Sequence, residues 1–230
     1  MFKDTLNQLL NGQDLSHDQM LAVMQQVMGG ELTSAQISAF LIALRLKGET
    51  VDEIAAAATV MRQLSTKVNI TDKTYLVDTC GTGGSGIPTF NVSTVSAFVA
   101  SAAGATVAKH GGRSASSICG SADILELLGV DLTKTAEQVG ETVDAIGVGF
   151  MFAQNHHSAM KHAAPVRREL GVSTMFNVLG PLTNPASARR QVLGVFNQAL
   201  TGKLAQVLQK LGSEHVLAVH GADGVDEISF

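Results

Sequence analysis

A glycine-rich segment constrains the fold of this chain more than any other feature. Residues 78–86 read Asp-Thr-Cys-Gly-Thr-Gly-Gly-Ser-Gly and follow the apolar run Tyr75–Val77, which is typical of a buried strand. Small residues from Val95 to Ala103 then predict a helix. Glycine lets backbone N–H groups approach a ligand closely, and a helix start adds unpaired N–H groups. Although glycines alone would also suit a flexible surface turn, the order strand, loop, helix favours a phosphate or diphosphate site.

The chain after residue 74 alternates apolar runs with helical segments. Strands are expected at residues 75–77, 106–108, 148–152 and 216–219. Helices are expected near residues 93–103, 121–128, 135–146, 157–170 and 201–211. This order predicts an α/β fold with a mainly parallel sheet flanked by helices. Ligands in such sheets bind at the carboxyl ends of the strands, where the glycine-rich segment lies.

The first 65 residues have the apolar spacing of helices instead. Four helices with short loops predict a small all-helical N-terminal domain (1–65), to which later helical segments can add. Its methionines, Met20, Met24 and Met28, are expected in the core or at a subunit contact. The polar stretch 66–73 is expected to be a hinge, and residues 74–230 to form the α/β domain. Because the sequence ends soon after an apolar run and an acidic turn, we expect this α/β domain to be incomplete.

Composition excludes several classes of function. The net charge is −4 and no basic tract is present, which argues against nucleic acid as a partner. Two cysteines, Cys80 and Cys119, are too few for a disulfide framework or a zinc knuckle. No run reaches transmembrane length and the first residues lack a signal pattern, so a cytoplasmic protein without membrane contact is expected.

A second anion site is predicted after the strand at residues 106–108. Lys109 can act as a point charge on a phosphate, and Arg113 can bind one with two parallel hydrogen bonds. Serine hydroxyls follow at Ser114, Ser116, Ser117 and Ser121. The alternative is a solvated basic turn. Polar side chains also stand where the glycine-rich segment meets its helix, at Asn91, Ser93 and Thr94, and they suit either phosphate and Mg²⁺ binding or helix capping.

Further candidates come later in the chain. The pair Asp226-Glu227 follows an expected strand and suggests Mg²⁺ beside a diphosphate, although an isolated acidic pair is usually a solvated turn. Arg167 can bind a substrate carboxylate or compensate a helix dipole. His156 and His157 can frame a polar ligand or be structural. Residues 176–185 predict a rigid apolar loop that could contact a flat aromatic ligand.

Taken together, these segments resemble the anthranilate phosphoribosyltransferase family, which has a nucleoside phosphorylase-like transferase fold. The resemblance covers nearly the whole chain in order. The matching segments are Gly81–Gly84, Asn91–Thr94, Lys109–Gly111, Arg113–Ser114, Gly120–Asp123, Pro165–Arg167, Phe176–Pro185 and Asp226–Glu227.

The resemblance implies an enzyme of tryptophan biosynthesis that joins the amine of anthranilate to C1′ of phosphoribosyl diphosphate and releases diphosphate, with no covalent nucleophile. It implies Mg²⁺ at Ser93, Asp226 and Glu227, and a homodimer formed through the helical domain. It assigns anthranilate to Gly81, His110, Gly112, His157 and Arg167. It assigns phosphoribosyl diphosphate to Gly81, Gly84, Ser85, Thr89, Asn91, Val92, Ser93, Thr94, Lys109, Arg113, Ser114, Ser116, Ser117 and Ser121.

Three residues depart from the family pattern. Ser85 stands where an aspartate is usual, Gly112 where an asparagine contacts anthranilate, and Ser173 where arginine is common.

Two alternative functions follow. A pyrimidine nucleoside phosphorylase-like enzyme shares the fold but lacks a segment like 177–185. A non-catalytic protein that binds phosphoribosyl diphosphate or nucleic acid would be consistent with Ser85 and Gly112, but not with the absence of a basic surface.

Overall fold

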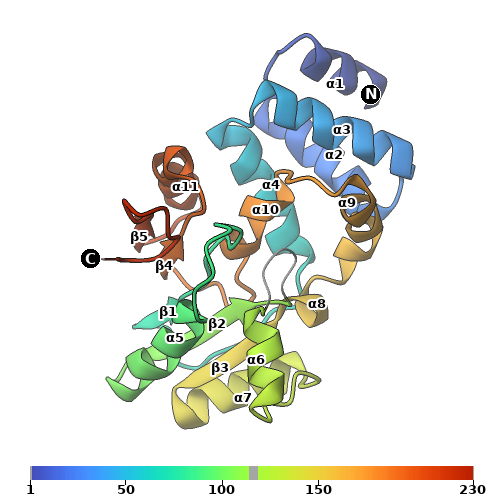
Figure 1. Cartoon of the computed structure of the whole chain (residues 1–230). Coiled ribbons are helices and arrows are strands. Elements are labelled where there is room, and N and C mark those ends of the chain that lie inside the picture. The colour runs from blue at the N-terminus through green and yellow to red at the C-terminus, as the bar shows by residue number, and fades with distance from the viewer. Residues whose placement is uncertain (1, 114–118, 230) are drawn as a thin grey trace. The chain divides into compact units, whose positions relative to one another are not determined.

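The computed structural model describes residues 2–113 and 119–229. The chain divides into two compact units, shown with their elements in Figure 1. The first unit comprises residues 1–65 and 157–183, and the second comprises residues 66–156 and 184–230. No helix among the described residues combines the length and apolar character needed to cross a membrane.

The helical unit begins with four helices whose starts are defined by their sequences. These helices are α1 (Phe2–Leu10), α2 (His17–Gly29), α3 (Ser34–Lys47) and α4 (Val51–Leu64). A capping box precedes each of the last three, in which a Ser or Thr side chain accepts from the N3 amide and the N3 side chain accepts from the cap amide. Met20, Met24 and Met28 are buried, which confirms their predicted place in a core.

A later segment of the chain completes this unit. It contains η1 (Ser158–His162), α9 (Ala164–Leu170), α10 (Phe176–Leu179) and η2 (Gly180–Leu182). These short helices contact α2, α3 and α4, and the Arg62 side chain donates to the Leu182 carbonyl oxygen at 2.6 Å. The structure thus differs from the α/β boundary of 74–230 expected from the sequence. The segment 157–183 cannot bury its apolar residues alone, and it does so against the helical bundle.

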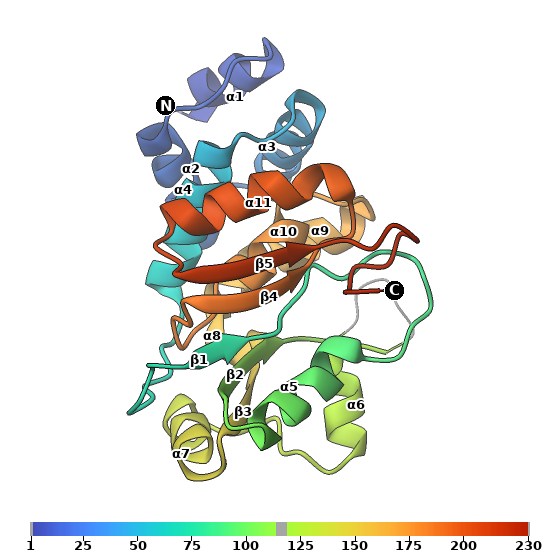
Figure 2. The ribbon, with the colours of Figure 1, turned by 90° about the vertical axis from the view of Figure 1, so that its left-hand side faces the viewer.

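The second unit is built on one parallel sheet. In the described residues its strands are β1 (Leu76–Asp78), β2 (Thr106–Gly111), β3 (Val148–Phe152), β4 (Arg190–Gly194) and β5 (His215–Val219), in the order β3-β2-β1-β4-β5. The helices are α5 (Val92–Ala102), α6 (Ser121–Leu127), α7 (Ala136–Ile146), α8 (Ala153–His156) and α11 (Gln198–Lys210). Figure 2 shows α11 beside β5 and α5 beside β2. The predicted fold class, a helical domain with a parallel α/β domain, is confirmed.

The order of strands places β1 at the centre of the sheet. Strands β2 and β3 are added on one side of β1, and the later strands β4 and β5 are added on the other side, so the order of addition reverses at β1. Ligands of open parallel sheets bind at such a switch point, beyond the carboxyl ends of the strands. The glycine-rich segment that follows β1 therefore starts at the position where a ligand is expected.

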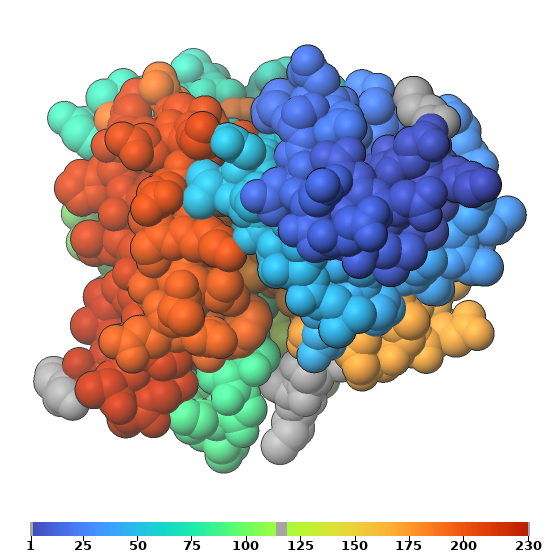
Figure 3. Space-filling view, turned by 90° about the horizontal axis from the view of Figure 1, so that it is seen from above, coloured from blue at the N-terminus to red at the C-terminus, as the bar shows by residue number. Residues whose placement is uncertain are grey.

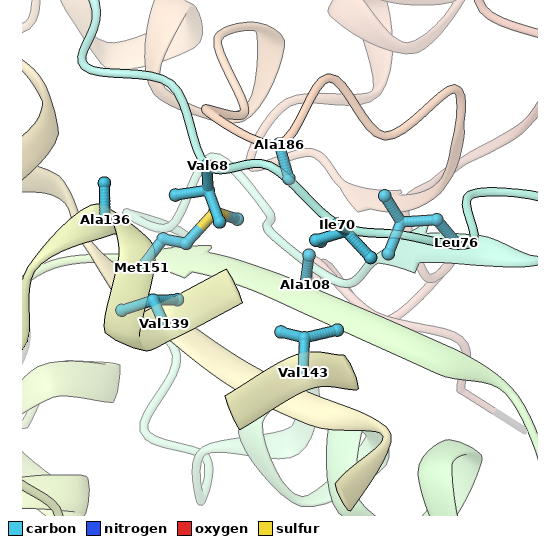
Figure 4. Close-up of a cluster of buried hydrophobic side chains, with 9 residues drawn as sticks. All are labelled: Val68, Ile70, Leu76, Ala108, Ala136, Val139, Val143, Met151 and Ala186. Atoms are coloured by element: carbon cyan, nitrogen blue, oxygen red, sulfur yellow. The ribbon is translucent and has the colours of Figure 1, made fainter. Parts of the chain in front are cut away.

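The stretch 66–73 is fixed to the α/β unit rather than forming a free hinge. Val68 and Ile70 are buried in a core cluster with residues of β1, β2, α7 and β3 (Figure 4). The Val68 amide donates to the Pro185 carbonyl oxygen at 3.2 Å, and the Thr71 hydroxyl donates to Asp144 at 2.6 Å. The polar composition of this stretch concealed its two inward-facing apolar residues, which place it in the α/β unit.

A glycine in α7 provides a test of this packing. A Cβ at Gly140 would overlap the Asn69 backbone oxygen, although alanine is normally favoured inside a helix. We expect Gly140→Ala to lower the free energy of unfolding by about 1–3 kcal/mol, because the stretch 66–73 must move. Urea unfolding of the purified protein measures this change.

The matched control is Gly202→Ala in α11, a helix that lies at the surface (Figure 3). No atom lies within 4 Å of a Cβ at Gly202, so this variant should be more stable by about 0.5–1 kcal/mol. Equal stabilisation by both substitutions would contradict the close contact of α7 with Asn69.

Candidate functional site

The glycine-rich loop after β1 has a backbone that only glycine adopts readily. Gly83, Gly84 and Gly86 have φ angles of 61°, 84° and 75°. The loop is also attached to the end of β4, since the Thr82 amide donates to the Gly194 carbonyl oxygen at 2.8 Å. A Cβ at Gly81 would lie 3.0 Å from the same oxygen. The loop therefore has a defined course next to the carboxyl ends of two neighbouring strands.

Lys109 on β2 contacts the start of this loop at Thr79. The residue is 3% exposed, and its Nζ donates to Ser93 Oγ at 3.1 Å and to Thr79 Oγ1 at 3.3 Å. No ion pair joins Lys109 to a carboxylate in the part of the chain that the structure describes. A buried ammonium group held only by neutral oxygens keeps its charge available to an incoming anion. This geometry is the strongest local evidence for a phosphate or diphosphate site.

The start of α5 supplies the polar groups that face Lys109. Ser93 accepts from Lys109, and Thr94 has a buried hydroxyl without a partner in the described residues. The Asn91 side chain donates to the Cys119 carbonyl oxygen at 3.1 Å and makes no helix-capping hydrogen bond. Val92 and Ser93 also line a cavity of about 500 Å³ that reaches Thr79 and Glu227 and extends along the sheet to Arg190 and His215, the first residues of β4 and β5. The hydrogen bonds of Lys109 to Thr79 and Ser93 join the elements after β1 and β2 in one polar site.

The acidic pair lies beside the same helix start. The half-buried Glu227 carboxyl group lies near the Ser93 backbone N–H, which acts to lower its pKa. Burial and the adjacent Asp226 raise the pKa of Glu227, while Lys109 acts in the opposite direction. Excess negative charge of this kind is relieved by a cation. Two carboxylates and a serine hydroxyl are hard oxygen donors that suit Mg²⁺, so the residues present fit the implied ion.

Arg113 and Ser121 are engaged within the α/β unit. Arg113 makes ion pairs with Asp123 at 2.9 Å and Glu126 at 2.8 Å, and these raise the pKa of the guanidinium. It also lies 5.7 Å from the centroid of the Phe152 ring. Ser121 Oγ donates to the Gly112 carbonyl oxygen at 3.3 Å. Arg113 must leave its acidic partners before it can bind a phosphate with both guanidinium nitrogens.

The anthranilate candidates are divided between the two units. His110 is buried and its amide donates to Asp78. A Cβ at Gly112 would lie 3.9 Å from the Ala153 methyl group. In the helical unit, His157 is buried, and the Arg167 guanidinium lies 5.3 Å from the centroid of the Phe176 ring. Burial lowers the pKa of Arg167.

The other phosphoribosyl diphosphate candidates are less constrained. Gly84 and Thr89 are exposed and Ser85 is half-buried. Ser114, Ser116 and Ser117 lie outside the described residues. Two residues that the sequence did not single out belong to the site: Thr79, which accepts from Lys109, and Asn184, which is buried against Asp78. The signal that could have identified them was a polar residue in an otherwise apolar setting. Thr79 directly follows a strand, and Asn184 lies inside the apolar segment 176–185, where a polar side chain needs a hydrogen-bond partner.

Comparison with known proteins identifies the family. A glycosyl transferase family helical bundle domain matches residues 3–65, and a glycosyl transferase family a/b domain matches residues 73–230. The anthranilate phosphoribosyltransferase of Methylobacillus flagellatus is 64% identical over 228 residues, which are 99% of this chain and 67% of that protein. The enzyme of Hydrogenovibrio crunogenus is 64% identical over 227 residues, with the same coverage of both chains. This chain thus spans about two thirds of the length of these relatives.

Solved structures agree with this result. Anthranilate phosphoribosyltransferase from Thermus thermophilus has a TM-score of 0.91 and 46% identity, covering 98% of this chain and 68% of that one. The Saccharomyces cerevisiae enzyme in complex with PRPP and Mg has a TM-score of 0.81 and 33% identity, covering 93% and 62%. The family, fold and enzyme class inferred from the sequence are therefore confirmed: the chain belongs to the glycosyl transferase family, among its anthranilate phosphoribosyltransferases.

Proposed function

We propose that this protein transfers the phosphoribosyl group of phosphoribosyl diphosphate to the amine of anthranilate and releases diphosphate, in tryptophan biosynthesis. The observation that carries the proposal is Lys109, a buried ammonium group without an ion pair in the described residues, placed between the glycine-rich loop and Ser93. Support for the substrates comes from yeast relatives, one in complex with PRPP and Mg and one with 4-fluoroanthranilate.

The reaction needs no covalent nucleophile from the protein. The nitrogen of anthranilate forms a bond to C1′, the bond from C1′ to the diphosphate oxygen breaks, and the amine loses a proton. An aromatic amine is already neutral at pH 7, so the main requirement is to stabilise the charge that develops on diphosphate. Lys109 and the N–H groups of the glycine-rich loop supply fixed positive charge and dipoles for that purpose. Orienting both substrates lowers the barrier further, by up to roughly 7–11 kcal/mol.

Mg²⁺ fits the acidic side of the site. Ser93, Asp226 and Glu227 would hold it, and the bound ion would supply positive charge to the diphosphate oxygens. Glu227 and Ser93 line the same cavity, which places this carboxyl group beside the start of α5. Arg167, whose guanidinium stacks on Phe176, is assigned to the carboxylate of anthranilate.

The assay is direct. Anthranilate is fluorescent, and the protein incubated with phosphoribosyl diphosphate, Mg²⁺ and anthranilate should cause a steady loss of this signal. A matched incubation without Mg²⁺ should be slower. No loss at ample protein, with calorimetric binding of phosphoribosyl diphosphate intact, would instead support a non-catalytic binding protein.

A homodimer formed through the helical unit is part of the proposal. Leu10, Leu46 and Leu64 in this unit are 64%, 80% and 46% exposed, and apolar side chains of this size favour a protein contact. Light scattering during size-exclusion chromatography should give twice the 24.0 kDa chain mass. Leu46→Glu should shift the protein to monomer, and a monomeric parent protein would refute this part.

Gly112 allows a sharp test of the acceptor site. Among the described residues, only the Ala153 methyl group lies near a Cβ at this position, which leaves room for a side chain. We expect Gly112→Asn to lower KM for anthranilate about 2–10-fold, because it restores one hydrogen bond worth roughly 0.5–1.5 kcal/mol. Initial rates over a range of anthranilate concentrations measure the change. Gly112→Ala is the control, because it adds side-chain volume without a hydrogen-bonding group. An equal decrease of KM in Gly112→Ala would contradict the hydrogen-bond explanation.

A further inference from the structure

Asp78, the last residue of β1, is buried at the base of the site and makes no ion pair in the described residues. The residue is 1% exposed. Its Oδ1 accepts from the Cys80 amide at 3.0 Å and from the His110 amide at 3.1 Å, and its Oδ2 accepts from Asn184 Nδ2 at 2.7 Å. All three neighbours are donors, which suits a carboxylate that only accepts. Burial raises the pKa of Asp78, while Lys109 and these three hydrogen bonds act in the opposite direction and favour the ionised form.

The three donors belong to three different segments that border the site. Cys80 begins the glycine-rich loop, and His110 follows Lys109 at the end of β2. Asn184 lies near the end of the segment 176–185 and is held in turn, because its Nδ2 also donates to the Ala108 carbonyl oxygen at 3.0 Å and its Oδ1 accepts from the Ala186 amide at 2.9 Å. One carboxylate therefore sets the positions of the two loops that carry the anion-binding groups.

The separation of Asp78 from Lys109 has a second consequence. Lys109 Nζ donates to Ser93 and Thr79 rather than to Asp78, and the positive charge of Lys109 acts to lower the pKa of Asp78. A direct ion pair would neutralise the lysine and block it. Asp78 accepts its hydrogen bonds from amide groups instead. Its negative charge therefore balances the buried positive charge of Lys109 from a distance, and Nζ stays available to bind an anion.

We infer that Asp78 is a positioning residue for the diphosphate site, which fixes the glycine-rich loop against Lys109 and leaves the Lys109 ammonium group without a direct ion pair in the described residues. The inference rests on the proposed function, because it takes phosphoribosyl diphosphate as the anion.

The chain offers a charge-swap experiment. In Asp78→Asn, an oxygen can still accept from Cys80 and His110, but its NH₂ group then faces the NH₂ group of Asn184. In Asn184→Asp, two carboxylates face each other. The double variant Asp78→Asn/Asn184→Asp restores a donor opposite an acceptor and keeps one negative charge, at the expense of the bond to the Ala108 carbonyl oxygen.

The readout is the Kd for phosphoribosyl diphosphate with Mg²⁺, measured by calorimetry, together with kcat and both KM values. We expect Asp78→Asn to raise this Kd about 10–100-fold, the scale of a hydrogen-bonded charge. KM for anthranilate at saturating phosphoribosyl diphosphate should change less than about 2-fold. The double variant should recover most of the affinity.

The control is Val143→Ala, a core substitution in α7 that lowers stability without touching the site. Val143→Ala should lower Tm and leave Kd unchanged. If Asp78→Asn behaves in the same way, or if the double variant binds no better than the single variants, the inference is wrong. If the parent protein binds phosphoribosyl diphosphate without turnover, the proposed function fails, and the Kd values still decide the role of Asp78. A parent protein that does not bind it overturns both.

Discussion

Replacing Lys109 with methionine is expected to lower kcat/KM for phosphoribosyl diphosphate about 10²–10³-fold, the scale of one lost group that stabilises developing charge. Methionine keeps most of the apolar length of the side chain and removes the charge together with the hydrogen bonds to Ser93 and Thr79. The same change should lower Tm less than the loss of a direct buried ion pair does, because the ammonium group makes no ion pair in the described residues. Fluorescence kinetics and a thermal melt of the same sample measure both quantities.

Two other lysines serve as controls for this prediction. Lys210→Met removes the same charge from the exposed end of α11 and should leave kcat/KM unchanged within about 2-fold. Lys47 is a structural lysine, with Asp14 at 2.7 Å and the fully buried Glu53 at 2.9 Å. Lys47→Met should therefore lower Tm, since it leaves Glu53 without its cation. A Lys109→Met variant with activity near that of the parent, or with the Tm loss of Lys47→Met, would refute the role assigned to Lys109.

The parts of this site that could be predicted from the sequence are those whose chemistry is local. Glycines after an apolar run and a lysine at the next strand end specify an anion site through neighbouring residues alone. Asp226 and Glu227 also needed only their position after a strand. In each case the relevant groups are close in the sequence, and the parallel sheet brings the strand ends together.

The features that could not be predicted depend on contacts across the chain. The sequence did not predict the strand β4, because it begins with the polar residues Arg190 and Gln191. Polar residues are not typical of an inner strand of a parallel sheet, which is the position of β4 between β1 and β5. Arg113 is held by Glu126, which is 13 residues away and comes within reach only when α6 has formed. Asp78 and Asn184 are 106 residues apart, so their contact has no local pattern.

Neutralising the acidic pair is expected to abolish most of the response to Mg²⁺. In Asp226→Asn/Glu227→Gln, the two carboxylates of the acidic pair become amides, which are much weaker ligands for a hard cation. We expect kcat at ordinary Mg²⁺ concentrations to fall by about 10²-fold, and the concentration of Mg²⁺ for half-maximal rate to rise at least about 10-fold. Titrating Mg²⁺ in the fluorescence assay gives both values.

A thermal melt separates ion binding from turnover. With phosphoribosyl diphosphate present, Mg²⁺ should raise Tm of the parent protein, because a ligand that binds the folded state stabilises it by mass action. The double variant should show little of this shift. Without Mg²⁺ the variant should melt no earlier than the parent, since burial and the adjacent Asp226 already raise the pKa of Glu227 and make its ionised form unfavourable.

The control for the acidic pair is Asp223→Asn in the same turn. The Asp223 Oδ1 accepts from the Val225 amide at 3.2 Å and from the Ser229 hydroxyl at 3.1 Å, and an asparagine oxygen can accept both bonds. This variant loses one negative charge near the site but keeps the local geometry, so its Mg²⁺ dependence should match that of the parent. A loss of Mg²⁺ response as large as that of the double variant would mean that net charge of the turn, rather than ligation by Asp226 and Glu227, governs the effect of the ion.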